Sequence, residues 1–227
     1  DIAAVPCNLA SVLYNKSEGE ILTLAINTLG VLYIVEAGEN ITAVGDLKDK
    51  TIYSTGQGTT PEYTLRHILS ANGIDPDKDV TIEFKSEATE VGALLAAAEG
   101  DMVAMLPQPY VTAVQAQNQN VKVCLDMTEE WGKISDQKLI TGVLVARKAF
   151  IEENKAAFDV FLADYAASTK YVTENVDEAA AWVAEYGIVA KEPLAKKAIP
   201  QCNITCVTGE EMKALVNNYC TVLFDQN

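Results

Sequence analysis

The chain has 227 residues, which is enough for one large domain or for two smaller ones with a core each. Hydrophobic residues make up 49% and charged residues 22%, a composition typical of a folded globular protein rather than a disordered one. No apolar run reaches the ~18 residues that a membrane span needs, and the net charge of −15 argues against binding to nucleic acid or directly to an anionic membrane surface.

Short β-rich runs alternate with amphipathic stretches through the first part of the chain. Strands are expected at residues 2–5, 21–26, 31–35, 51–54, 80–84, 102–106, 121–125 and 139–146. Helices are expected at residues 9–15, 61–71, 90–98 and 110–117, and then at 150–173, 176–185, 193–199 and 210–224. Residues 127–138 are polar and are expected to be irregular. Alternation of this kind predicts parallel α/β sheets.

One pattern occurs twice: an acidic residue, an apolar strand, a proline and a helix, starting at Asp1 and again at Asp101. Two such units suggest two lobes of similar construction. The first lobe is expected to hold residues 1–44 and 139–227, and the second residues 45–138. The chain would then cross between the lobes near residues 36–45 and 137–142. A cleft between lobes joined by such a hinge is a favoured place for a ligand.

The strongest local feature is the loop at residues 54–61, Ser-Thr-Gly-Gln-Gly-Thr-Thr-Pro, between a predicted strand and a predicted helix. Free N–H groups at the helix start, with the hydroxyls of Ser54, Thr55, Thr59 and Thr60, would form a donor-rich site for a carboxylate, sulfonate, phosphate or carbonyl oxygen. The loop is neither a Walker A motif nor G-x-G-x-x-G. The alternative is an ordinary capped helix.

Three further segments place polar residues where strands end. Residues 85–90, Lys-Ser-Glu-Ala-Thr-Glu, follow a strand and begin a helix, so they are either a cap or a ligand contact. Two prolines hold Gln108 at the end of a predicted parallel strand, where the ligands of open sheets gather. In the first lobe, Asn8 and the pair Asn27 and Thr28 occupy equivalent positions, with a helix cap as the alternative for Asn8.

Residues typical of catalysis are sparse. The one histidine, His67, falls in mid-helix, and the chain has no G-x-S-x-G, H-E-x-x-H or Cys/His pair. Trp131 and Tyr33 could stack on an aromatic ligand, although packing in the core or at its rim is the simpler interpretation. The sequence therefore indicates a binding protein rather than an enzyme, and it predicts no cofactor.

The five cysteines do not form a disulfide framework, because their number is odd and they are sparse. Cys202, Cys206 and Cys220 could hold one disulfide. A metal is less favoured, since Cys-x₃-Cys without a nearby histidine is a weak metal signal.

Five segments, taken in their order along the chain, resemble the motifs of a known protein family. They are Asp1-Ile-Ala-Ala-Val-Pro-x-Asn8, Asp46-Leu47-Lys48-Asp49-Lys50-Thr51-Ile52, and the segments at residues 54–60, 85–90 and 105–110. Together they resemble the ABC-transporter substrate-binding proteins of the nitrate, sulfonate, taurine and thiamine-precursor branch, although Asp49 replaces the usual glycine.

The resemblance implies a type-II periplasmic-binding-protein fold: α/β, with mixed, mostly parallel sheets flanked by helices. It also implies a place outside the cytoplasmic membrane, in the periplasm or on a lipid anchor. The lobes would close over a small polar or aromatic solute and deliver it to an ABC permease with its ATPase. The ligand contacts carried over to this chain are Asn8, Asn27, Thr28, Thr55, Gly58, Thr59, Thr60, Glu87, Ala88 and Gln108.

Family members carry a further segment before the position of Asp1, whose first strand is expected between the strands at residues 2–5 and 21–26. Without it the first sheet would have an unpaired buried edge, so we expect an upstream segment in the native protein. Two other functions stay open: a ligand-sensing domain of a receptor or regulator, and a pyrimidine-precursor synthase on the same fold. The synthases carry clustered cysteines and a sacrificial histidine, whereas the cysteines here are dispersed.

Overall fold

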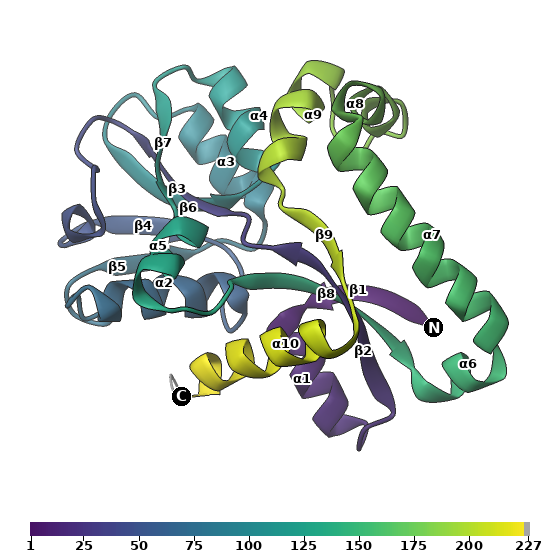
Figure 1. The fold of residues 1–227 in the computed structure, drawn as a ribbon. Helices are drawn as coiled ribbons and strands as arrows, with labels where there is room; N and C mark the ends of the chain where they lie inside the picture. The colour runs from purple at the N-terminus through teal and green to yellow at the C-terminus, as the bar shows by residue number, and fades with distance from the viewer. Residues whose placement is uncertain (225–227) are drawn as a thin grey trace.

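Two sheets, each covered by helices on both faces, make up the fold (Figure 1). It is a computed structural model that describes residues 1–224. The strands are β1 (Ile2–Pro6), β2 (Ile21–Leu29), β3 (Leu32–Ala37), β4 (Thr51–Ser54), β5 (Thr81–Phe84), β6 (Met102–Pro107), β7 (Val121–Asp126), β8 (Ile140–Arg147) and β9 (Ile204–Val207). The helices are α1 (Cys7–Lys16), α2 (Thr60–Ala71), α3 (Ala88–Ala96), α4 (Tyr110–Gln117), α5 (Met127–Ile134), α6 (Lys148–Glu153), α7 (Lys155–Glu174), α8 (Val176–Glu185), α9 (Glu192–Ala198) and α10 (Gly209–Phe224), with 3₁₀ turns at Val44–Leu47 and Ile199–Gln201. None of the helices in the described chain is long and apolar enough to cross a bilayer.

The four-stranded sheet, in the order β1-β8-β2-β9, is antiparallel in each of its pairings. In β8, Val143 and Val145 join the core with α1 and α10, whereas Leu144 and Ala146 pack with Phe158 of α7. The expectation of mostly parallel sheets is wrong here, because neighbouring strands come from distant segments rather than from consecutive β-α-β units. β8 lies between β1 and β2, so the placement expected for an upstream strand is also wrong.

The five-stranded sheet, in the order β5-β4-β6-β3-β7, is mixed. β4 runs parallel to β5 and β6, as expected for strands joined through helices, but β3 is antiparallel to β6 and β7. Along β3, Leu32 and Ile34 belong to the core with α2 and α5, while Tyr33 and Val35 belong to the core with α3 and α4. The period of two thus explains why this strand is buried on both faces.

The chain passes from the first sheet to the second earlier than expected. β3 was assigned to the first lobe, but it pairs within the five-stranded sheet, so the crossing lies between β2 and β3. The polar break at residues 36–45 is instead a turn within one sheet. The buried carboxylate of Glu36 holds this turn by accepting the N–H groups of Asn40 and Ile41, each at 3.0 Å. The second crossing, between α5 and β8, overlaps the expected one.

Three local expectations differ from the structure. Residues 127–134, expected to be irregular, form α5, which begins where the Asp126 carboxylate accepts the N–H of Thr128 at 2.8 Å. Residues 150–173, expected to be one helix, are interrupted at Asn154 between α6 and α7. The short edge strand β9 was not predicted, because its four residues are all only half-buried and give no clear pattern.

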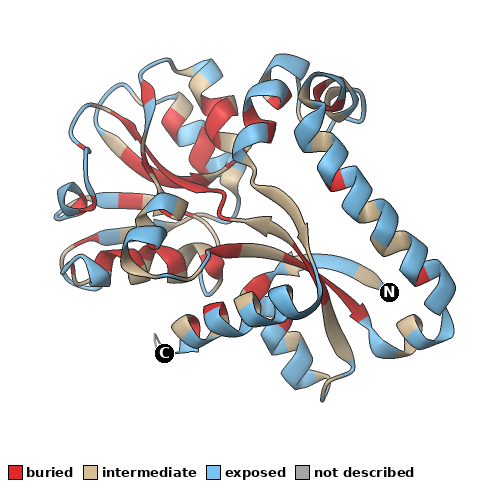
Figure 2. Ribbon diagram, in the orientation of Figure 1, coloured by how far each residue is buried: buried red, intermediate tan, exposed pale blue. Residues whose placement is uncertain are grey.

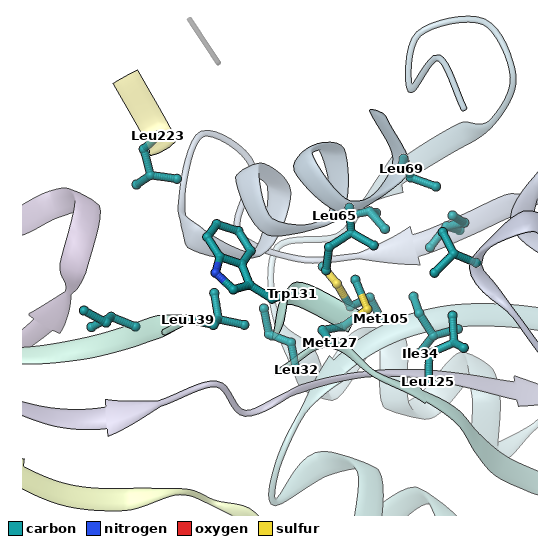
Figure 3. Close-up of a cluster of buried hydrophobic side chains, with 14 of the residues drawn as sticks. Leu32, Ile34, Leu65, Leu69, Met105, Leu125, Met127, Trp131, Leu139 and Leu223 are labelled. Atoms are coloured by element: carbon teal, nitrogen blue, oxygen red, sulfur yellow. The ribbon is translucent and has the colours of Figure 1, made fainter. Parts of the chain in front are cut away.

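The largest group of buried side chains joins the two sheets. Figure 2 shows β3 buried along its length, whereas α7 exposes most of its surface. In Figure 3, Trp131 of α5 lies among core side chains that include Leu139 and Leu223. Its ring is 4.7 Å from that of His67 on α2 and 5.7 Å from that of Tyr219 on α10, measured between centroids. Because Trp131 is 0% exposed, core packing, and not ligand stacking, is its role.

Candidate functional site

A pocket of about 360 Å³, here called the junction pocket, lies where the two sheets meet. Its walls come from β1, β8, the ends of β2 and β6, and the start of α2. The lining residues are Ala4, Val5, Pro6, Asn27, Thr28, Val31, Leu32, Thr59, Thr60, Pro61, Pro107, Thr141 and Gly142. Sites for small molecules span roughly 300–1,000 Å³, so the junction pocket suits a small solute.

Two buried polar atoms of the junction pocket have no hydrogen-bond partner within residues 1–224: Asn27 Oδ1 and Thr141 Oγ1. Leaving such an atom unpaired costs about 1–3 kcal/mol, and buried polar groups are ordinarily matched by protein, water or ligand. Asn27 Oδ1 also lies close to Gly142, since a Cβ built on Gly142 would be 2.6 Å from it. Two residues of the pocket lining therefore carry hydrogen-bonding capacity that residues 1–224 do not use.

Several hydrogen-bond donors of the loop at residues 54–61 are already bonded to neighbouring acceptors of the protein. The hydroxyl and the N–H of Thr59 donate to the Gly56 carbonyl, at 2.6 and 2.9 Å. The N–H of Gly58 donates to the carboxylate of Glu62 at 2.7 Å, and Glu62 also accepts a hydrogen bond from Arg66 at 2.9 Å. Part of the predicted anion site is thus already bonded to the protein's own acceptors, and Glu62 places a negative charge beside it.

Asn8 connects α1 with this loop. Its amide nitrogen donates to the Gly58 carbonyl at 3.4 Å, and its amide oxygen accepts the Thr60 hydroxyl at 3.3 Å. It is the second residue of α1, whose cap position is Pro6, and its side chain serves as a contact between the two halves of the molecule. Asn8 does not line the junction pocket; it lines a separate groove of about 570 Å³ between α1 and α10, here called the α1–α10 groove.

The structure brings four of the predicted contact residues together in the junction pocket: Asn27, Thr28, Thr59 and Thr60. The predicted contacts that line neither this pocket nor the α1–α10 groove are Thr55, Gly58, Glu87, Ala88 and Gln108.

Both ends of the Gln108 side-chain amide are hydrogen-bonded within the protein. Its side chain is 6% exposed. The amide nitrogen donates to Gln201 Oε1 at 2.6 Å, and the amide oxygen accepts the Thr112 hydroxyl at 2.9 Å. Gln108 therefore joins the start of α4 to the turn that follows α9.

Glu87 and Ala88 begin α3 at a distance from the pocket lining. Glu87 is exposed as the residue before the first helical turn, and its side chain makes no cap hydrogen bond. Ala88 packs against the core beneath α3 and α4. This segment begins α3, and a ligand contact from Glu87 or Ala88 stays a prediction.

Sequence reasoning missed Thr141 and Gly142, which line the pocket from β8. A signal was available, because an isolated glycine inside a strand often marks a close approach of another group. Here the close neighbour is Asn27, on the adjacent strand β2.

All five cysteines are free thiols in this structure, and it contains no disulfide among Cys202, Cys206 and Cys220, where one was possible. Cys220 instead shares a hydrogen bond with Cys7, which raises the pKa of Cys7 and lowers that of Cys220. Burial lowers the pKa of His67. No group of three or more His, Cys, Asp or Glu side chains in residues 1–224 is arranged to hold a metal ion.

The fold, with a pocket between two sheets, is that of the type-II periplasmic binding proteins. Residues 14–179 match the family model described as NMT1/THI5 like, and the chain belongs to this family. The expected type-II fold is therefore confirmed, although its sheets are not mostly parallel. A comparison with curated protein sequences found no match.

Solved structures agree with this fold at low sequence identity. An ABC transporter structure from Parabacteroides distasonis has a TM-score of 0.79 and 24% identity, over 99% of this chain and 74% of that one. The periplasmic aliphatic sulphonate-binding protein SsuA from Escherichia coli has a TM-score of 0.77 and 15% identity, over 100% of this chain and 70% of that one. A mutant of DszB in complex with biphenyl-2-sulfinic acid has a TM-score of 0.65 and 15% identity, over 93% of this chain and 74% of that one.

Proposed function

We propose that this protein is the extracytoplasmic solute-binding component of an ABC importer and that the junction pocket holds its solute. The observation that carries the proposal is the chemistry of the pocket lining. Amide and hydroxyl groups stand among apolar walls, and no carboxylate, imidazole, amine or thiol within residues 1–224 is among the lining residues. Such a lining orients a solute by hydrogen bonds but supplies no general acid or base, which favours binding over catalysis.

The relatives support the same assignment. SsuA is described as a periplasmic protein that binds aliphatic sulphonates, and the structure from Parabacteroides distasonis is described as an ABC transporter. By this analogy the partners are a small-molecule solute, a permease and its ATPase. The location is the periplasm or a lipid anchor on the outer face of the cytoplasmic membrane. The net charge of −15 disfavours nucleic acid as a partner.

The position of the pocket suggests how binding favours a closed arrangement. Asn27 belongs to the four-stranded sheet, whereas Thr59 and Thr60 stand at the start of α2, against the five-stranded sheet. A solute that bonds both groups stabilises the arrangement in which they are close, and it shifts the population of open and closed states by that difference in affinity.

Asn27 Oδ1 has no partner within residues 1–224 and is an acceptor, so a solute that reaches it must bring an N–H or O–H donor. The hydroxyl of Thr141 serves as donor or acceptor. The apolar walls, which include Val31 and Leu32, suit a ring or a short aliphatic part. The solute class that fits is a small polar or aromatic molecule with at least one hydrogen-bond donor.

The test is a thermal-shift screen of the protein with sulfonates, nitrate, thiamine precursors, riboflavin and aromatic acids, followed by calorimetry on any hit. Asn27→Ala and Thr141→Val should each weaken the hit about tenfold, the equivalent of ~1.4 kcal/mol. Glu87→Gln, outside the pocket, is the matched control and should leave Kd unchanged. If Glu87→Gln weakens the hit and the two pocket variants do not, the junction pocket is not the site. A solute recovered chemically altered would point to an enzyme instead.

A further inference from the structure

Two thiols from opposite ends of the chain meet on one face of the four-stranded sheet. Cys7 is the first residue of α1, and Cys220 lies in the last turns of α10. The two helices are in contact and lie side by side beneath the sheet (Figure 1). The thiols share a hydrogen bond, so their sulfur atoms are already neighbours in the reduced protein.

We propose that Cys7 and Cys220 are a redox pair that closes to a disulfide and ties the C-terminal helix α10 to α1. In such a pair one thiol must be reached by the oxidant from solution, whereas the other can be buried, and the exposure of these two thiols differs in this way. Cys7 is 1% exposed, whereas Cys220 is half-buried and lines the α1–α10 groove, through which a reagent in solution can reach it. Cys220 is therefore the attacking thiol and Cys7 the resolving one.

The shared hydrogen bond supports this order. It lowers the pKa of Cys220 and, together with burial, raises that of Cys7, so the pair loses its first proton from Cys220. The thiolate is the nucleophile in thiol–disulfide exchange. The three remaining cysteines show no such asymmetry with a second thiol: burial raises the pKa of Cys202 and of Cys206, and burial together with the Glu36 carboxylate raises that of Cys124.

The oxidant is a disulfide, either of a thiol–disulfide oxidoreductase or of oxidised glutathione. The Cys220 thiolate attacks one sulfur of the oxidant, breaks its S–S bond and releases one thiolate. Cys7 then loses its proton and attacks the Cys220 sulfur of the mixed disulfide, which releases the second thiol. Two protein thiols are oxidised and one disulfide is reduced to two thiols, so two electrons and two protons pass to the oxidant.

The disulfide would reinforce contacts between the two halves of the molecule. Tyr219, next to Cys220, packs on Trp131 of α5, and Asn8, next to Cys7, bonds the loop at residues 54–61. Closing a loop of almost the whole chain restricts the unfolded state strongly, so the oxidised protein should melt about 5 °C or more above the reduced one.

The test uses the full chain, refolded from urea in glutathione buffers so that burial of Cys7 is no barrier. Peptide mapping without reductant should find the Cys7 peptide joined to the Cys220 peptide, with the expected rise in Tm. Cys220→Ser and Cys7→Ala should each abolish the linked peptide and the rise, while the matched control Cys206→Ser should keep both. The proposal is overturned if both thiols remain alkylatable in oxidised glutathione, or if the linkage joins other cysteines. Neither readout involves a solute, so this result is independent of the proposed function.

Discussion

Gly30 is the point at which the chain leaves the four-stranded sheet, and an added methyl group there should destabilise the fold. A Cβ on this buried residue would lie 2.0 Å from the Thr128 hydroxyl and 3.0 Å from the Thr128 Cβ. Rotation about χ1 of Thr128 moves the hydroxyl away, but its Cβ is fixed by the backbone of α5. Overpacking costs about 1–3 kcal/mol, and a contact with a fixed atom argues for the upper half of that range. Gly30→Ala should therefore lower Tm by about 5–10 °C.

Urea denaturation followed by fluorescence measures this loss, with Gly132→Ala as the control. A Cβ on Gly132, inside α5, meets no atom within 4 Å, so that change should stabilise the protein by up to ~1 kcal/mol through helix propensity. Thr128→Gly removes the fixed Cβ of Thr128, so the double mutant Gly30→Ala, Thr128→Gly should be less destabilised than the sum of the two single mutants, with coupling of about 1 kcal/mol. An unchanged urea midpoint for Gly30→Ala, or the absence of coupling, would refute the steric explanation.

Two further measurements test the contacts that join the two halves. Burial lowers the pKa of His67, so the unfolded chain binds more protons just below pH ~6.5, and the free energy of unfolding should fall as pH falls through that region. His67→Gln should flatten this slope between pH 7 and 5.5; equal slopes would show that other groups cause it. Asn8→Ala should cost at most ~1 kcal/mol but speed amide exchange in the loop at residues 54–61, whereas the exposed Asn15→Ala should leave exchange there unchanged.

Local structure could be predicted where the periodicity is strong. The helix at residues 110–117 and the strand at residues 51–54 agree with the structure to the residue. α5 was missed because only Met127 and Trp131 of its eight residues are buried, and the other positions read as polar. The start of α5 is set by the end of β7 and by the cap that Asp126 provides. Asp126 can be identified as a cap only when the end of the preceding strand is known.

Strand direction and the first crossing could not be read from the sequence, because both depend on pairing between distant segments. β3 and β2 have the same local character, yet β3 pairs with β6 and β7 while β2 pairs with β8 and β9. The polar residues after β3 look like a link between lobes. The buried carboxylate of Glu36 makes them a turn instead.

The sequence indicates which strand ends contribute to the candidate site, but it does not show which of their polar side chains are free to bind a solute. Residues at strand ends do gather, and four of those expected line one pocket. Whether a given polar side chain is free depends on partners from elsewhere in the chain. The amide of Gln108 is hydrogen-bonded to Gln201, which lies in another element far along the sequence. Thr141 Oγ1 has no partner among residues 1–224, and although Gly142 beside it signals a close approach, no local pattern predicts an unpaired hydroxyl.

These differences change what the loop at residues 54–61 can contribute to binding. With the N–H of Gly58 held by the Glu62 carboxylate, an anion placed there would have to displace a charged group that also bonds Arg66. Asn8 holds the same loop from the other side through Gly58 and Thr60. The loop is therefore better suited to form a rigid wall than to bind charge. Under the proposed function, selection by hydrogen bonding then falls to the opposite wall, where Asn27 Oδ1 has no partner among residues 1–224, and a solute would be recognised there by the donor that it offers rather than by a negative charge.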